Sequence, residues 1–148
     1  AKKLNVTRGS FYYHFESLEA FHRAVIARWS QKTSGQIAQE AHKIGEANAA
    51  LDDLLQKTLR SGEVLERAMR SWSTVSPLVA EAVEEVDQER IHIAETLLME
   101  AGVPESISAA RAKLLYWAAI GRLMLPFPQN NVLSSAEISG IAAMMLKP

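Results

Sequence analysis

The sequence predicts an all-α fold in which one short helix is followed by a body of six further helices. Apolar residues recur at helical spacing along most of the 148-residue chain, and no convincing alternating strand pattern appears. Capping residues, prolines and glycines at positions typical of helix starts and ends divide the chain into successive helices along its whole length. Nearly half of the residues (48%) are apolar, which is ample for the core of one domain.

Hydroxyl residues mark the starts of the first two predicted helices. Thr7 can cap a short helix that ends near His14. Ser17 can cap the next helix. Apolar residues at helical spacing extend that second helix to Ile44, and Gly45 follows as a stop signal. We therefore expect a short helix leading directly into a long one.

Glycine and proline separate the middle helices. We expect helices over residues 50–60 and 63–72, with Gly62 between them. The pair Ser76-Pro77 starts a long helix that Gly102 ends, because proline is favoured at the first helical position and glycine just beyond the last.

The last two predicted helices are the most apolar. One begins at Val103-Pro104 and reaches about Leu125, and its second half is apolar almost all round, as in helices buried on more than one side. After a loop over residues 126–131, Ser134 and Glu137 form a capping box that opens the other. If both helices faced solvent, the exposed apolar patch would exceed what soluble monomers usually tolerate. We expect a homodimer through these helices, as a four-helix bundle across a two-fold axis; coverage by a neighbouring helix of the same chain stays open.

Charge is unevenly divided in a chain whose formal net charge is −1. Residues 1–15 contain three cations and no acid, so the acidic excess lies in the remainder. The same stretch contains four aromatic residues. A small basic and aromatic helix can enter a DNA major groove while flanking hydroxyls and cations hold phosphates. The residues concerned are Lys2, Lys3, Arg8, Phe11, Tyr12, Tyr13 and Phe15.

Composition excludes several classes of protein. The chain has no cysteine, which excludes a disulfide framework and thiolate metal sites and fits a reducing compartment. The longest apolar run, near residues 114–125, is interrupted by Gly121 and Arg122 and is too short to span a bilayer. No signal peptide is visible. These features predict a cytoplasmic protein without a membrane partner.

The run LNVTRGSFYYHFESLEAF, residues 4–21, resembles the TetR (tetracycline-repressor) family of bacterial transcription regulators. It is similar to the turn, the recognition helix and the start of the following long helix in that family. Gly9, Tyr12, His14 and Phe15 fall at the family's spacing. The helical body, with a long helix after a proline and two apolar helices at the end, is also similar. Leu18 departs from the pattern, since the family usually has a phosphate-binding Lys there.

The resemblance implies a truncated helix-turn-helix DNA-binding unit in residues 1–18 and a six-helix ligand-binding and dimerisation body in residues 19–148. The chain lacks an initial Met and opens in mid-pattern, so we expect the missing first helices upstream and weak DNA binding without them. The implied function is a ligand-responsive repressor, not an enzyme, that binds a palindromic operator as a homodimer and needs no cofactor.

The resemblance also implies roles for single residues near the N-terminus. Thr7, Tyr12 and His14 would hold the DNA backbone, with lysines flanking phosphate. Arg8, Ser10 and Tyr13 would lie nearest base edges, and Gly9 would permit close approach. Val6, Phe11 and Phe15 would pack the small domain. The candidate DNA-binding residues are Lys3, Thr7, Arg8, Gly9, Ser10, Tyr12, Tyr13 and His14.

A ligand pocket lined by the middle helices is a further implication of the resemblance. For any single candidate residue, an ordinary place in the core is the commoner role. Their apolar character suggests an apolar, aromatic or lipophilic effector. Arg90 also falls on or near the core side of its helix, where a buried charge needs a partner. The candidate ligand-binding residues are Leu55, Leu59, Met69, Trp72, Ile91, Glu95, Met99 and Trp117.

Two alternative functions come from other classes. One is an all-helical small-molecule-binding or interaction domain that does not bind DNA. The other is a di-metal carboxylate bundle, because Glu19/His22 and Glu89/His92 each place a Glu and a His on one helix face. Against the metal site, Glu19 lies at the very start of its helix, and a solvated face surrounds the second pair.

Overall fold

The computed structural model describes residues 8–31, 44–60 and 64–147, and over these ranges the chain is all-helical, as predicted. Seven α-helices and a 3₁₀ turn follow one another in the described part. They are α1 Arg8–His14, α2 Leu18–Ser30, α4 Ala47–Arg60, α5 Val64–Ser73, α6 Pro77–Glu100, α7 Glu105–Met124, η3 Pro128–Asn130 and α8 Ser135–Met145. None of these helices is long and apolar enough to cross a membrane.

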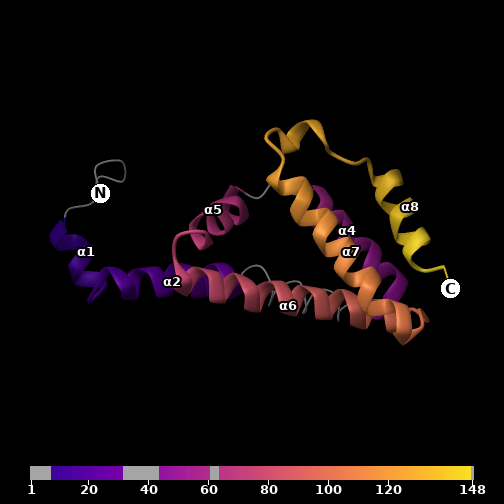
Figure 1. The fold of residues 1–148 in the computed structure, drawn as a ribbon, viewed down its shortest axis with the longest axis horizontal. Helices are drawn as coiled ribbons and strands as arrows, with labels where there is room; N and C mark the ends of the chain where they lie inside the picture. The colour runs from indigo at the N-terminus through magenta and orange to yellow at the C-terminus, as the bar shows by residue number, and fades with distance from the viewer. Residues whose placement is uncertain (1–7, 32–43, 61–63, 148) are drawn as a thin grey trace.

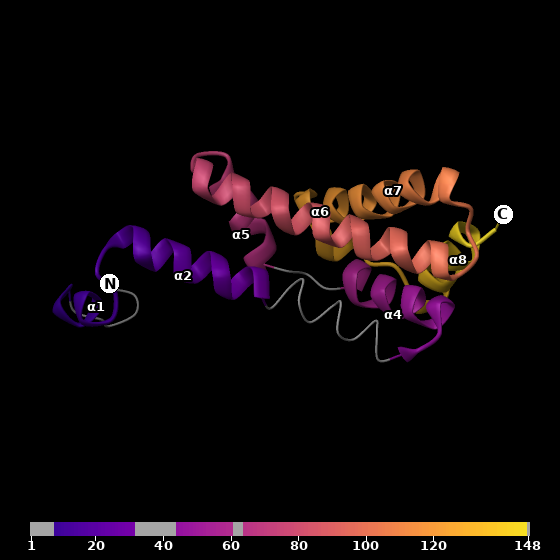
Figure 2. The same cartoon turned by 90° about the horizontal axis from the view of Figure 1, so that it is seen from below.

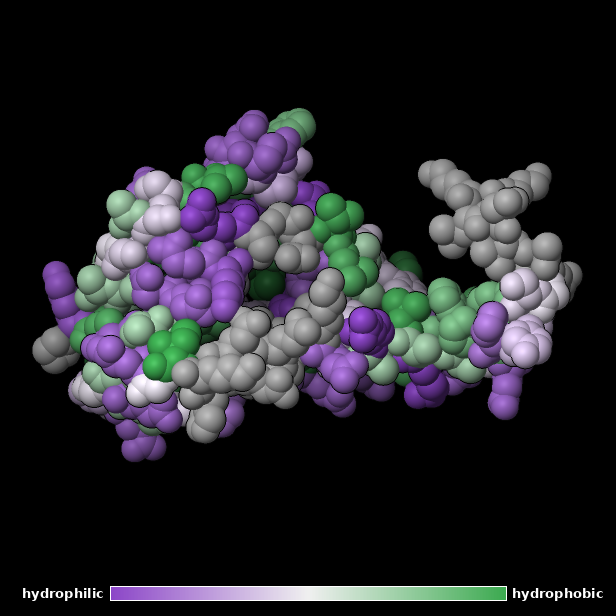
Figure 3. Space-filling view, turned by 180° about the vertical axis from the view of Figure 1, so that it is seen from behind, coloured by the Kyte–Doolittle hydropathy of each residue, from purple (hydrophilic) through white to green (hydrophobic). Residues whose placement is uncertain are grey.

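The long helix α6 is the element on which the others are arranged. It has 24 residues and so extends about 36 Å at 1.5 Å per residue. Helices α2 and α5 pack on its first half, and α4 and α7 pack along its second half (Figures 1 and 2). Helix α8 packs on α4 at the far end of the molecule. The α1–α2 arm projects from this thicker body, with hydrophobic side chains exposed along it (Figure 3).

Several helix boundaries follow the signals expected from the sequence. The Ser17 hydroxyl accepts a hydrogen bond from the third residue beyond it, at 3.0 Å, and caps α2. Pro77 is the first residue of α6, and Gly102 beyond its end has a φ of 92°, a conformation that glycine adopts without strain. The Ser134–Glu137 capping box opens α8.

Other boundaries differ or lie outside the described residues. Helix α4 begins at Ala47, three residues earlier than expected. The predicted cap Thr7 lies outside the described residues, as do residues 32–43 of the long second helix predicted from the sequence.

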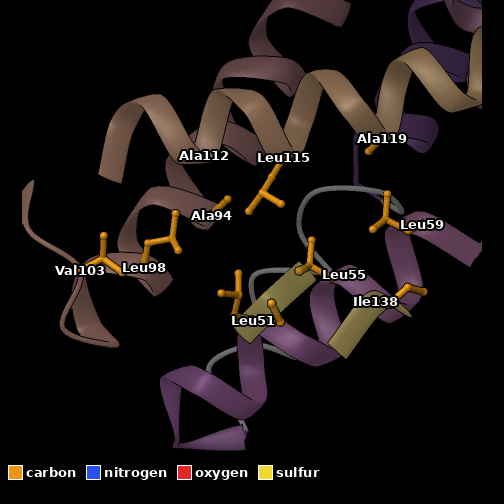
Figure 4. Packing of buried hydrophobic residues seen from close by; sticks show 11 residues of the cluster. Leu51, Leu55, Leu59, Ala94, Leu98, Val103, Ala112, Leu115, Ala119 and Ile138 are labelled. Carbon is orange, nitrogen blue, oxygen red and sulfur yellow. The ribbon is translucent and has the colours of Figure 1, made fainter. Parts of the chain in front are cut away.

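The buried apolar side chains form two separate clusters, and α6 contributes to both. The proximal cluster joins α2, α5 and the first half of α6, and consists of Ile26, Trp29, Met69, Val79, Val83 and Val86. The distal cluster joins α4, α7, α8 and the second half of α6, with side chains from α4 directed toward α6 and α7 (Figure 4). It consists of Leu51, Leu55, Leu59, Ala94, Leu98, Val103, Ala112, Leu115, Ala119, Ile138 and Ala142.

Arginines from neighbouring helices bind the carbonyls at three helix C-termini. Arg111 of α7 donates to the carbonyl of Met145 in α8 at 2.7 Å. Arg67 of α5 donates to the carbonyl of Leu125, which ends α7, at 3.0 Å. Arg122 of α7 reaches a carbonyl in the last turn of α4 at 3.4 Å. Cations at these positions interact favourably with the helix dipoles and tie the helices to one another.

Candidate functional site

Helix α1 turns one side toward α2 and the other toward solvent. Phe11 and Phe15 are half-buried, whereas Tyr12 and Tyr13 are 51% and 85% exposed. Three further residues predicted to bind DNA are also exposed: Gly9, Ser10 and His14. Helix α1 therefore has one half-buried side, with Phe11 and Phe15, and one exposed side.

Three candidate DNA-binding residues are not fully described. Lys3 and Thr7 lie outside the described residues, and Arg8 enters only as the first residue of α1. Leu18, at the position where the TetR family usually has Lys, is exposed on the first turn of α2. The candidate DNA-binding residues whose side chains the structure describes are therefore Gly9, Ser10, Tyr12, Tyr13 and His14, all on α1.

Three phenylalanines fix α1 on α2. Phe21 of α2 lies with its ring centroid 5.4 Å from that of Phe11 and 5.0 Å from that of Phe15, both in edge-on geometry. Phe11 and Phe15 are themselves 5.5 Å apart. Edge-to-face pairs at such distances stabilise beyond their buried area. We call these three rings the aromatic joint, and it makes the orientation of α1 depend on that of α2.

A buried carboxylate lies at the other end of α2. Glu66 of α5 is only 3% exposed. Its two oxygens accept hydrogen bonds from the guanidinium of Arg90, each at 3.0 Å, and one also accepts from Arg70 Nε at 3.0 Å. The indole Nε1 of Trp29, on α2, donates to Glu66 Oε2 at 3.2 Å. The guanidinium of Arg90 also lies 5.8 Å from the centroid of the Trp29 ring, within reach of a cation–π interaction.

The same group of side chains extends to α6 and α7. Arg70 donates to both oxygens of Asp87, at 3.0 and 2.7 Å, and to the hydroxyl of Tyr116 at 2.7 Å. The Tyr116 hydroxyl in turn donates to Asp87. Two guanidinium groups thus face two carboxylates, and the charges balance. We call the whole set the polar network; its members are Trp29, Glu66, Arg70, Asp87, Arg90 and Tyr116.

The polar network lies between the two hydrophobic clusters. On α6, Asp87 and Arg90 fall between Val86 of the proximal cluster and Ala94 of the distal cluster. The network takes side chains from α2, α5, α6 and α7, so a shift of any one helix changes bonds on the others. It connects the arm that carries α1 with the body.

The electrostatic environment favours the ionised form of Glu66 and the protonated form of Tyr116. Burial by itself raises the pKa of Glu66, but the hydrogen bonds and positive charge of Arg90, together with Arg70, bring it below its ordinary value. Burial, followed by the hydrogen bond to Asp87, raises the pKa of Tyr116, so its hydroxyl stays protonated as a donor.

Acid is expected to weaken the polar network through Glu66. The pKa of Glu66 is lower in the fold than in the unfolded chain. Its contribution to stability is therefore complete above about pH 4.3 and is lost as the pH falls through the folded-state pKa. We expect the difference in unfolding free energy between wild type and Glu66→Gln, measured by urea denaturation, to narrow below about pH 4. A difference that stays constant down to about pH 2 would contradict this origin.

The eight candidate ligand residues do not come together in one place. Leu55 and Leu59 belong to the distal cluster, and Ile91 packs against it. Met69 belongs to the proximal cluster, and Trp72 packs against it. The remaining three are half-buried or exposed along α6 and α7: Glu95, Met99 (38% exposed) and Trp117 (59% exposed). The structure thus places these residues in two separate clusters and at the surface.

Of the two Glu-x-x-His pairs, Glu89 and His92 are exposed on α6, and Glu19 and His22 have other neighbours. Glu19 forms an exposed ion pair with Arg23 at 2.8 Å, and the ring of His22 lies 4.8 Å from that of Trp72. Across the described ranges, no three His, Cys, Asp or Glu side chains gather as a metal-ion site.

Glu66 is not among the candidate site residues predicted from the sequence, because a single acidic residue in an amphipathic helix is usually solvated. Val64 is 80% exposed, and the buried residues of this helix are Glu66 and Met69. A usable signal was present, since Glu66, Met69 and Arg70 share a helix face at spacings of three and four. That face carries the partner that the core-side Arg90 required.

No family model, curated protein or solved structure matches this chain.

Proposed function

We propose that this chain is part of a ligand-responsive transcriptional repressor that binds a palindromic operator as a homodimer. The observation that carries the proposal is the exposed surface of α1. Its candidate DNA-binding residues from Gly9 to His14 are exposed, while Phe11 and Phe15 hold the helix on α2. The B-DNA major groove is about 12 Å wide and admits one α-helix.

The chemistry of α1 suits this role. Tyr12 and Tyr13 present phenolic groups that can donate to phosphate or base-edge acceptors. Ser10 adds a hydroxyl, and Gly9 has no side chain to hold the helix away from DNA. Contacts to phosphate position the helix, and contacts to base edges supply sequence preference.

Response to a ligand requires a connection between the body and α1. Helix α2 carries the aromatic joint near one end and Trp29 of the polar network near the other. A ligand that prefers one arrangement of α5, α6 or α7 would therefore favour one position of α2 and of α1. Such a ligand shifts the equilibrium only by its difference in affinity for the two arrangements.

Dimerisation is supported by apolar faces of α7 and α8 that stay uncovered in a single chain. On α7, Leu115, Ala119 and Leu123 are buried, whereas other apolar residues of the same helix are exposed. Helix α8 buries one side against α4 and exposes apolar and small residues on another. The exposed residues are Leu114, Trp117, Ala118, Gly121 and Met124 on α7, and Gly140, Ala143 and Met144 on α8. In a two-fold dimer, two copies of α1 would enter successive major grooves about 34–36 Å apart.

Fluorescence anisotropy with DNA from upstream of the protein's own coding gene tests the proposal. We expect the full-length protein to bind one palindromic segment more tightly than unrelated DNA of equal length. Affinity should also fall steeply with salt, because bound lysines and arginines displace counterions from phosphate. Equal affinity for all sequences, or no binding at low salt, would contradict the proposal. The second outcome would favour a helical ligand-binding domain.

Removing one phenolic hydroxyl is expected to weaken operator binding. In the full-length protein, Tyr12→Phe should reduce affinity about tenfold, because a hydrogen bond to a charged phosphate contributes about 1.5–3 kcal/mol. The loss should be nearly the same for operator and unrelated DNA, since phosphate carries no sequence information. Tyr13→Phe is the matched control, and its loss should be larger on operator DNA. Unchanged affinity of Tyr12→Phe would refute the phosphate role.

A further inference from the structure

A hollow of about 460 Å³ opens at the end of the body where α4, α5 and α7 meet the η3 turn. Figure 1 shows the last turn of α7, the η3 turn and the start of α5 along the upper side of the molecule, between the α1–α2 arm and α8. The volume is within the usual range of small-molecule sites, about 300–1,000 Å³. None of the eight ligand residues expected from the sequence lines it. Its described lining is Arg60, Val64, Arg67, Arg122, Leu123, Pro126, Pro128, Gln129 and Val132.

The lining combines cations with apolar surface. Three of the nine lining residues are arginines, five are apolar and none is acidic. Arg60 donates to the Ser135 hydroxyl at 2.8 Å, and Arg67 donates to the carbonyl of Leu125 at 3.0 Å. Both acceptors are neutral, and neither arginine forms an ion pair with a residue in the described part of the chain. The positive charge of these two groups therefore remains available to an anion.

The hydrogen bonds of these arginines also fix their position. A guanidinium has five N–H donors in a planar fork, so a single bond to a neutral oxygen leaves donors for a second acceptor. Arg67 is held by the end of α7, and Arg60 by the start of α8. Both heads are thus anchored beside the hollow, which lowers the entropy lost when an anion binds. Charge-assisted bonds from arginine to a carboxylate are among the stronger hydrogen bonds in proteins.

We propose that this arginine hollow binds a small apolar carboxylate. The carboxylate would accept hydrogen bonds from Arg60 and Arg67, and the apolar part of the ligand would lie against Leu123, Pro126 and Val132. A fully polar anion such as phosphate would leave the apolar lining unused, and a neutral apolar compound would leave two cations unpaired.

The hollow lies next to the polar network along α5. Arg67 follows Glu66 directly, and Glu66 is bonded to Trp29 of α2. A carboxylate that pulled on Arg67 would therefore act on the helix that positions Glu66. The role of the hollow as an effector site rests on the proposed function. Carboxylate binding by the hollow does not depend on whether the chain binds DNA.

Isothermal titration of the full chain with naphthoate and with the matching neutral naphthalenemethanol tests the proposal. We expect wild type to bind the carboxylate at least about tenfold more tightly than the alcohol, because hydrogen bonds to a charged group contribute about 1.5–3 kcal/mol. The double variant Arg60→Met/Arg67→Met should lose this preference and keep its affinity for the alcohol. Arg28→Met, which removes an exposed arginine on α2, should bind both compounds as wild type does.

A second variant allows the proposal to be tested even if the double variant does not fold. Val132→Trp, at an exposed position, fills the hollow and leaves both arginines in place. This variant should bind both the acid and the alcohol more weakly than wild type, while its far-UV circular dichroism stays unchanged. Equal binding of acid and alcohol by wild type, no binding of either, or equally strong binding of inorganic phosphate would each overturn the proposal. Adding naphthoate to the DNA titration distinguishes carboxylate binding by the hollow from its proposed role as an effector site. Tight naphthoate binding without an effect on DNA affinity would refute only the effector role, and failure of DNA binding leaves the calorimetric result intact.

Discussion

Replacement of Glu66 by alanine is expected to destabilise the chain by about 3–5 kcal/mol, the usual cost of removing one partner from a buried ion pair. The variant would leave the Arg90 guanidinium buried without its bidentate carboxylate, and would remove the acceptor of the Trp29 indole. A typical domain has a total stability of only about 5–15 kcal/mol. Urea denaturation followed by circular dichroism measures the loss.

The matched control is Glu81→Ala, which removes an exposed carboxylate from α6 and should change stability by less than about 0.5 kcal/mol. A second control separates loss of the pair from loss of a side chain. Glu66→Met/Arg90→Met removes both charges together and fills the space with apolar atoms. It should be less destabilised than the alanine variant, because no charge is left without a partner. A loss below about 1 kcal/mol in Glu66→Ala would mean that the carboxylate contributes little to the fold.

Trp117→Glu is expected to convert the proposed dimer into a monomer without unfolding it. Trp117 lies on the uncovered face of α7 and is 59% exposed in the single chain, so glutamate is tolerated in the monomer. In the dimer, the same position would place two carboxylates in a dry interface, where unpaired charges are costly. Sedimentation velocity at micromolar concentration measures the change in mass.

The affinity of the protein for its operator should also fall when the dimer is lost. Losing the second recognition helix removes the gain from bivalent binding, which is about 10²–10⁴-fold for two well-spaced sites. Val75→Glu is the control, because Val75 is a similarly exposed apolar residue between α5 and α6. It should leave both mass and operator affinity unchanged. A Trp117→Glu protein that stays dimeric would refute the α7–α8 interface.

The sequence predicts local structure well where one or two residues decide it. The helix caps at Ser17 and at the Ser134–Glu137 pair can be predicted from the spacing of hydroxyl and carboxylate residues alone, because these groups form hydrogen bonds to the backbone within one helical turn. Pro77 and Gly102 act through their own backbone preferences. None of these signals depends on what packs against the helix, so tertiary structure did not override them.

The buried face of α5 shows where such reading fails. Which face of a short helix is buried depends on its partners, and here the partners are the charged Arg90 of α6 as well as the apolar proximal cluster. Periodicity favours the side of Val64 and Leu65, which the structure leaves exposed. The arginine hollow was missed for a related reason, since its lining comes from four elements that only the fold brings together.

The division of the core into two clusters has a consequence for local unfolding. The proximal cluster is small and holds α2 and α5 on one half of α6, whereas the distal cluster joins four helices. Free energies of local opening follow the number of buried apolar contacts, so the arm can open while the distal half stays folded. The polar network is the boundary between these two cooperative units, and its ion pairs set how independently each one opens. A partner that binds α1 and orders the arm would therefore slow amide hydrogen exchange on the proximal side of that boundary, and much less beyond it.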